Sequence, residues 1–252
     1  LPIGEQSIPL NELIGKHITL EHVGTINCSS CGKKTKKSYS QGFCYPCMQK
    51  LAQCDMCIMK PETCHHHLGT CREPEWGTKN CFVPHYVYLA NSSGLKVGIT
   101  RHTQIPTRWI DQGAIQALPI FKVASRIQSG LVEVALSEFV ADKTNWRAML
   151  KGSPEKIDLK ARAKELTPKI AQKLADIALQ YGEDAVEPLE SEVVELRYPV
   201  QEYLEKISSF NFDKTPVVSG VLLGIKGQYL IFDKGVINMR KFTSYHINIK
   251  WT

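Results

Sequence analysis

The stretch "HYVYLANSSGLKVGITR" (85–101) holds two short apolar runs on either side of the polar loop NSSG (91–94). β-type residues dominate both runs, and a short loop ending in glycine is typical of a hairpin. The pattern predicts two antiparallel strands. A register centred near Ser92 would place Tyr88 opposite Lys96 across the hairpin, and a one-residue slip would break that pairing.

Three further elements are predicted after the hairpin. Pro106 suits the start of a helix, with Arg108 in its first turn. Residues 120–126 favour a strand, and "GLVEVALSEFVAD" (130–142) has the periodicity of an amphipathic helix. Together with the hairpin, these elements predict a compact α/β module over residues 85–152.

All nine cysteines fall between residues 28 and 81, and the first four form two CxxC pairs. Twelve residues separate the pair Cys28 and Cys31 from the pair Cys44 and Cys47. Two thiolate pairs on tight turns supply four soft ligands in the tetrahedral arrangement that structural zinc prefers. The spacing therefore predicts a zinc-ribbon-like segment within residues 1–84, with a zinc ion that stabilises the fold.

Five more thiols follow and compete for what we expect to be a second structural zinc site. The surest ligands are the next CxxC pair, and the spacing does not choose among the other three. These five are Cys54, Cys57, Cys64, Cys71 and Cys81. An odd number of closely spaced cysteines favours metal binding over disulfides, so we expect a reducing, cytoplasmic setting.

Charge is unevenly distributed along the 252 residues, whose formal net charge is +6. Residues 28–50 and 91–130 are basic, whereas residues 155–195 are acidic and contain seven of the seventeen glutamates. This distribution fits an anionic partner such as DNA or RNA. No apolar run approaches the length of a membrane span, so no membrane partner is expected. The oligomeric state is not predictable from these features.

The last third of the chain (153–252) predicts helices over 153–182 and three or four antiparallel strands over 217–251. The strands would form a small barrel that also takes the N-terminal strand 16–23. Several lysines and one arginine would make one edge of this barrel basic, namely Lys226, Lys234, Arg240, Lys241 and Lys250. The fold class is thus α+β, with a zinc segment, a central α/β module, a helical segment and a β-rich end.

The central module resembles the GIY-YIG nuclease superfamily over about residues 85–150. The resemblance rests on Tyr-Val-Tyr (86–88), Lys-Val-Gly (96–98), the downstream Arg108 and a glutamate on the later helix. It is to divergent members of the superfamily, whose second motif begins with Lys. It implies an α/β sandwich that hydrolyses phosphodiester bonds with a divalent ion, Mg²⁺ or Mn²⁺. The Glu-x-x-Leu spacing favours Glu133 as its ligand, and Glu138 is the alternative.

The same resemblance makes Tyr88, Lys96 and Arg108 the other candidate catalytic residues. Nucleic acid would also contact nearby aromatic and basic side chains. These are Tyr86, Arg101, Trp109, Lys143, Trp146 and Arg147. Lys96 replaces the usual tyrosine, which leaves two alternatives open: a nucleic-acid-binding protein without catalysis, and a zinc-stabilised protein-interaction module.

Nearly the whole chain also resembles DUF2797, a bacterial family of unknown function. The stretches "GTCREPEWG", "KVGITR", "PTRWIDQGA", "DKTNWRAMLKG" and "GIKGQYLIFDKGVIN" carry this resemblance. The family implies no activity of its own, so any function has to be argued from the residues.

Overall fold

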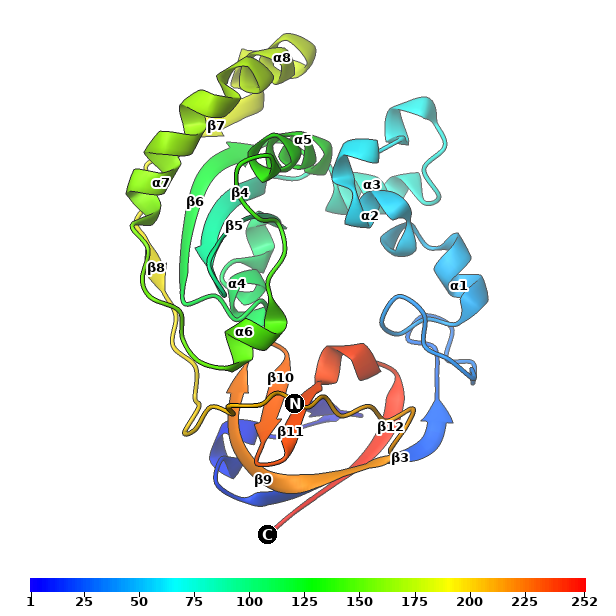
Figure 1. Cartoon of the computed structure of the whole chain (residues 1–252). Helices are drawn as coiled ribbons and strands as arrows, with labels where there is room; N and C mark the ends of the chain where they lie inside the picture. The colour runs from blue at the N-terminus through cyan, green and yellow to red at the C-terminus, as the bar shows by residue number, and fades with distance from the viewer. The chain divides into compact units, whose positions relative to one another are not determined.

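The computed structural model describes residues 1–252, which form a mixed α/β protein with two compact units (Figure 1). Unit 1 comprises Leu1–Lys50, Leu150–Gly152 and Arg197–Thr252. Unit 2 comprises Leu51–Met149 and Ser153–Leu196. The division of the sequence at residues 84 and 152 into three domains stays a prediction. None of the helices has the length and apolar character needed to cross a bilayer.

Unit 1 is built on a five-stranded antiparallel sheet in the order β11-β10-β9-β3-β12. Its members are β3 (His17–Ile26), β9 (Val217–Lys226), β10 (Tyr229–Phe232), β11 (Gly235–Asn238) and β12 (Tyr245–Trp251). Leu20 of the N-terminal strand pairs with Val218 and Ile249, which confirms that this strand joins the C-terminal ones. β11 and β12 remain edges, so the sheet is open, and the predicted barrel is not closed.

Alternate residues of β9 face the core of unit 1, and this alternation buries a lysine. Lys226 is fully buried and donates a 2.8 Å hydrogen bond to the carbonyl oxygen of Gly152. Its ammonium group also lies 5.1 Å from the ring centre of Tyr203 and 5.7 Å from that of Tyr198. The prediction that Lys226 lies on a basic edge was wrong, because the inward period of β9 extends to its last residue.

Unit 1 also contains the short strands β1 (Pro2–Ile3) and β2 (Gln6–Ser7), the helix α1 (Tyr45–Lys50), and two 3-10 helices, η1 (Leu10–Leu13) and η8 (Met239–Phe242).

Unit 2 contains a second sheet in the order β5-β4-β6-β7, with β8 also paired to β6. Its strands are β4 (His85–Asn91), β5 (Leu95–Arg101), β6 (Gln116–Val123), β7 (Val186–Pro188) and β8 (Val194–Glu195). The predicted hairpin is confirmed as β4 and β5. Its register differs: Tyr88 pairs with Gly98, and Lys96 pairs with Ala90. The strands extend to Asn91 and Leu95, so the loop is centred one residue later than expected.

The two faces of this sheet carry different helices. On one face, Val87, Leu89 and Val97 share a core with residues of α5, α7 and α8. On the other face, Tyr88 and Ala90 pack with Trp109 of α4. The helices are α4 (Thr107–Asp111), α5 (Arg126–Ser137), α7 (Leu159–Leu166) and α8 (Ala171–Tyr181). The helix predicted at 130–142 begins and ends earlier, at Arg126 and Ser137. Ser125 and Gln128 form a capping box, which fixes its start.

The cysteine-rich part of unit 2 consists of short helical turns that pack on α5. It includes α2 (Met56–Met59) and α3 (Pro74–Asn80). Outside this part, the short helix α6 (Trp146–Leu150) lies between α5 and α7 in the chain. Gly130 of α5 permits the close approach, since a Cβ there would lie 2.6 Å from Pro61 Cβ. Arg126 adds a 2.6 Å hydrogen bond to the carbonyl oxygen of Ile58. These contacts hold the second group of cysteines against the sheet module.

Candidate metal centre and catalytic site

The first four cysteines converge in unit 1, as their spacing predicted. The Sγ atoms of Cys28, Cys31, Cys44 and Cys47 all lie within 4.8 Å of one another, and Cys31 Sγ is 3.7 Å from Cys44 Sγ. A tetrahedral zinc ion with Zn–S bonds of about 2.3 Å would separate its thiolates by about 3.8 Å. Two turns create the arrangement, one directly after β3 and one at the start of α1. The four thiols therefore fit a closed structural zinc site.

The ionisation of these thiols supports the same conclusion. Burial opposes ionisation of Cys28, but hydrogen bonds from backbone groups of Cys31, Cys44 and Ser30 outweigh it and lower its pKa to about 6. The neighbouring thiol of Cys44 is the main cause that raises the pKa of Cys47 to about 12. Thiols this crowded cannot all ionise unless a cation compensates their charge, and a bound metal ion supplies that charge.

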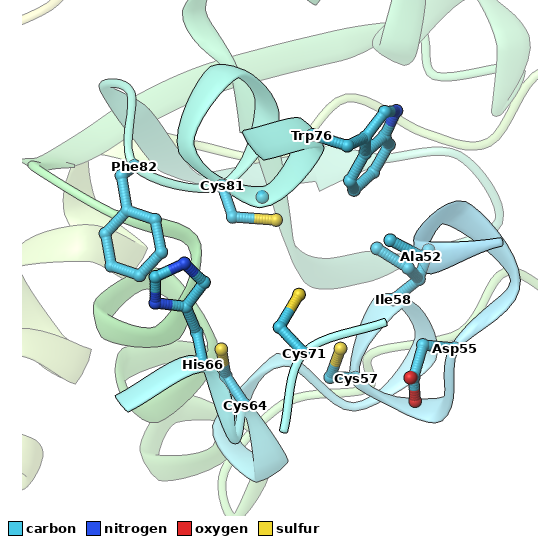
Figure 2. A pocket seen from close by; sticks show the side chains of 11 residues that line it. Ala52, Asp55, Cys57, Ile58, Cys64, His66, Cys71, Trp76, Cys81 and Phe82 are labelled. Atoms are coloured by element: carbon cyan, nitrogen blue, oxygen red, sulfur yellow. The ribbon is translucent and has the colours of Figure 1, made fainter. Parts of the chain in front are cut away.

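A second group of cysteines lines a pocket in unit 2 (Figure 2). Its four thiols are those of Cys57, Cys64, Cys71 and Cys81. In the view of Figure 2 the four sulfur atoms are separate from one another, and that of Cys71 lies between those of Cys81 and Cys57. Cys54, which the CxxC pattern favoured as a ligand, does not line the pocket. The backbone is extended at Asp55, so residues 54–57 do not form a knuckle turn of the kind that joins Cys28 and Cys31.

The four pocket thiols influence one another electrostatically. Burial raises the pKa of Cys57 to about 11, and the negative charge of Asp55 and then the other three pocket cysteines add to the effect. Burial also raises the pKa of Cys81, which the positive charge of Arg126 opposes. Each thiolate therefore becomes easier to form when positive charge enters the pocket.

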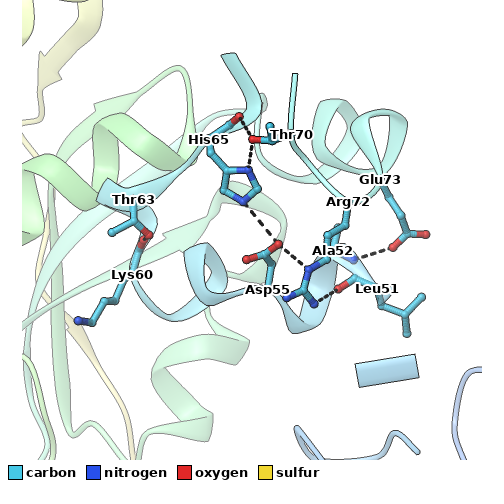
Figure 3. A network of polar contacts seen from close by, with 9 residues as sticks. All are labelled: Leu51, Ala52, Asp55, Lys60, Thr63, His65, Thr70, Arg72 and Glu73. Atoms are coloured by element: carbon cyan, nitrogen blue, oxygen red, sulfur yellow. Dashed lines mark hydrogen bonds and ion pairs between the residues drawn. The ribbon is translucent and has the colours of Figure 1, made fainter. Parts of the chain in front are cut away.

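Beside the pocket, a polar network holds the two chain segments that carry Cys57 and Cys71 (Figure 3). Asp55 accepts from Arg72 Nε at 2.8 Å and lies 3.5 Å from His65 Nε2. His65 Nδ1 is 2.7 Å from the hydroxyl of Thr70. Asp55, Cys57 and His65 are close enough together to suggest a metal site. The guanidinium group already neutralises the carboxylate, so we interpret this trio as a structural network.

The candidate catalytic residues surround the β4–β5 hairpin. Tyr88 is fully buried, and its hydroxyl fits against Gly98, where a Cβ would lie only 2.6 Å from it. The side-chain amide of Gln112 lies between Tyr88 and Arg108. With its oxygen oriented towards the arginine, this oxygen accepts from Arg108 Nη2 and Nε at 3.2 and 3.3 Å, and the amide nitrogen donates to the Tyr88 hydroxyl at 2.8 Å. Burial raises the pKa of Tyr88 to about 12. Tyr88 thus supports Arg108 through Gln112 and is a poor base at neutral pH.

Lys96 is the most perturbed cation of the hairpin. Only 4% of it is exposed, and burial together with the nearby charge of Arg108 lowers its pKa to about 8. The negative charges of Glu133 and Asp142 oppose this shift. Burial raises the pKa of Glu133, which Lys96 and Arg126 oppose. Lys96 and Glu133 therefore lie close enough to alter each other's ionisation, and the charge of Arg108 acts on both.

The other candidate residues differ in accessibility. Glu138 follows α5 and is exposed. Trp109 is only 2% exposed and packs edge-on against Tyr88 at 5.9 Å, so it belongs to the core and its predicted contact with nucleic acid was wrong. Arg101 donates to the side chain of Asn80.

Tyr86 is half-buried, Lys143 is exposed, and Arg147 stacks over the half-buried Trp146 ring at 4.4 Å. Tyr86, Lys143, Trp146 and Arg147 are therefore accessible to a ligand.

Sequence reasoning missed Gln112, Arg126 and Asp142. Gln112 follows α4 in a polar turn, and nothing in its spacing distinguishes it. Arg126 opens α5, where a cation is unfavourable, but the sequence placed residue 126 in the preceding strand, so this misfit was not visible. Its burial and its nearness to both Cys81 and Glu133 require the tertiary structure.

The fold and these sites define a mixed α/β protein with a four-cysteine metal centre suited to zinc. Residues 15–247 match the model of a family described as "Protein of unknown function (DUF2797)", and the chain belongs to this family. No curated protein and no solved structure matches the chain.

Proposed function

We propose that unit 2 binds nucleic acid and hydrolyses its phosphodiester bonds at a site formed by Lys96, Arg108 and Glu133. The observation that carries this proposal is Lys96, a nearly buried lysine whose pKa of about 8 leaves part of it neutral near physiological pH. A lysine in this state is suited to take or deliver a proton. Burial of an ammonium group is unfavourable for stability, so a functional role explains its presence better than a structural one.

The neighbouring side chains supply the other requirements of the reaction. Arg108 is exposed, and its guanidinium group can bind a phosphate oxygen through two hydrogen bonds. Gln112, which also contacts the Tyr88 hydroxyl, orients the guanidinium group of Arg108. Glu133 is the carboxylate that would hold a divalent ion, and such an ion would stabilise the charge that develops on the phosphate.

Surface charge around this site favours a long anionic substrate. Lys143 and the Arg147–Trp146 stack lie in the same unit and offer a cation and an aromatic face. Single-stranded nucleic acid uses this combination, because phosphates bind the cations and bases stack on the rings. The basic residues of the zinc segment belong to the other unit and are not needed for the proposal.

The test is a cleavage screen over single-stranded and double-stranded DNA and RNA in Mg²⁺ or Mn²⁺. We expect the wild type to cut at least one substrate and Glu133→Gln to lose at least 100-fold in rate. Glu138→Gln is the matched control, since it changes an exposed glutamate at the end of the same helix, and it should retain full activity. Cleavage that survives Glu133→Gln would remove this residue from the site.

The two alternatives give different results in the same screen. A protein that only binds would retain salt-dependent affinity for nucleic acid without cleavage by the wild type. A protein-interaction module would show neither binding nor cleavage. A binding function without catalysis would still use Arg108 as its phosphate contact, because this arginine is exposed.

A further inference from the structure

The pocket lined by Cys57, Cys64, Cys71 and Cys81 differs from the first metal centre in the spacing of its thiols. All four Sγ atoms of the first centre lie within 4.8 Å of one another, whereas the pocket cysteines do not form such a group. Figure 2 shows four separate sulfur atoms, which reach the pocket from different segments of the chain. A single zinc ion draws its thiolates together, so this wider arrangement fits a larger occupant.

We propose that these four cysteines hold an iron–sulfur cluster. Four thiolates are the usual ligands of such a cluster, and its several iron atoms keep the cysteine sulfurs further apart than one ion does. The four thiols would bind the iron atoms as thiolates after losing their protons. The inference is independent of the proposed nuclease activity.

The rest of the lining suits a cluster. Ile58, Trp76 and Phe82 give the pocket apolar walls, and an apolar shell limits access of water to bound iron and sulfide. His66 also lines the pocket, and its Nε2 atom is buried with no hydrogen-bond partner. Its ring packs on Phe82 with centroids 4.6 Å apart. A cluster sulfide would accept a hydrogen bond from such a nitrogen, and hydrogen bonds of this kind tune the cluster's potential.

Two features prepare the pocket for its occupant. Gly77 lies against Cys71 and His66, where a Cβ would be 3.5 Å from Cys71 Sγ and 3.2 Å from His66 Cδ2. The Asp55–Arg72 ion pair holds the segments that carry Cys57 and Cys71 from outside the pocket. The ligand set is therefore positioned by the fold.

The experiment is metal and sulfide analysis of the full chain, purified without oxygen and reconstituted with ferrous iron and sulfide. We expect iron and acid-labile sulfide in equal amounts, a visible charge-transfer absorption, and one zinc per chain in the first centre. Cys71→Ser should lose the iron and the absorption while retaining that zinc, which shows that unit 1 remains folded. Cys54→Ser is the matched control and should keep the cluster.

Several results would overturn the proposal. Two zinc ions per chain and no iron would show that the pocket closes around a single ion. Loss of iron in Cys54→Ser but not in Cys71→Ser would identify a different ligand set. If Cys71→Ser does not fold, Mössbauer spectra of the wild type decide the question, since iron that lacks tetrahedral sulfur coordination would contradict the assignment.

Discussion

Replacing Lys96 with methionine should stabilise the protein at neutral pH while removing its proposed activity. Lys96 is 4% exposed, and its pKa falls from 10.5 to about 8. At about 1.36 kcal/mol per pH unit, this difference corresponds to roughly 3 kcal/mol of unfavourable free energy when the folded protein carries the charge. Methionine has a similar length and no charge, so Lys96→Met should recover up to that amount.

The pH dependence isolates this effect from changes in packing. Below about pH 8 the lysine is protonated in the folded and the unfolded state, and the folded state carries the full free-energy cost of burying the charge. Between about pH 8 and 10.5 the unfolded state keeps the proton that the folded state has lost. The unfolding free energy of the wild type should therefore gain up to roughly 3 kcal/mol from this group as the pH rises through that window. Lys96→Met should lack this contribution.

The measurement is urea unfolding of the wild type and Lys96→Met at pH 7 and pH 10, followed by tryptophan fluorescence. Three of the four tryptophans, Trp76, Trp109 and Trp146, lie in unit 2 and report on the unit that contains the substitution. The advantage of the variant should be largest at pH 7 and fall to about a quarter of that value at pH 10. An equal difference at both pH values, or a less stable variant at pH 7, would refute the reasoning.

Three further changes test other parts of the structure. Gly98→Ala should lower the unfolding free energy by about 1–3 kcal/mol in urea, because its Cβ would lie 2.6 Å from the Tyr88 hydroxyl, whereas Gly152→Ala has open space and should have little effect. Cys44→Ser should release the zinc of the first centre, detected by elemental analysis, and lower the thermal stability of unit 1. Gln112→Leu should remove the amide partner of the buried Tyr88 hydroxyl at a cost of about 1–3 kcal/mol, measured by urea unfolding.

Local patterns were sufficient to predict the elements of the central module. The hairpin and the helix that carries Arg108 follow from alternation, a glycine-containing loop and a proline, all of which act within a few residues. The register of the hairpin could not be predicted in the same way. It depends on where the loop is centred and on Gly98, whose missing side chain makes room for the Tyr88 ring.

The two cysteine groups show the same contrast. Cys28 and Cys44 belong to CxxC knuckles in which the chain turns back locally, so spacing alone predicted the site. The pocket cysteines come from four separate short segments, and the packing of those segments decides which thiols meet. That packing depends on distant contacts such as Gly130 against Pro61. For that reason spacing could not exclude Cys54.

Arg126 connects the pocket with the proposed catalytic site. Its backbone N–H donates to the carbonyl oxygen of Cys81 at 2.7 Å, and its guanidinium donates to Ile58. Its Nε atom is buried without a hydrogen-bond partner, and its charge acts on both Cys81 and Glu133. Since this arginine favours the ionised forms of both Cys81 and Glu133, one side chain links a pocket thiol electrostatically to the carboxylate of the proposed catalytic site.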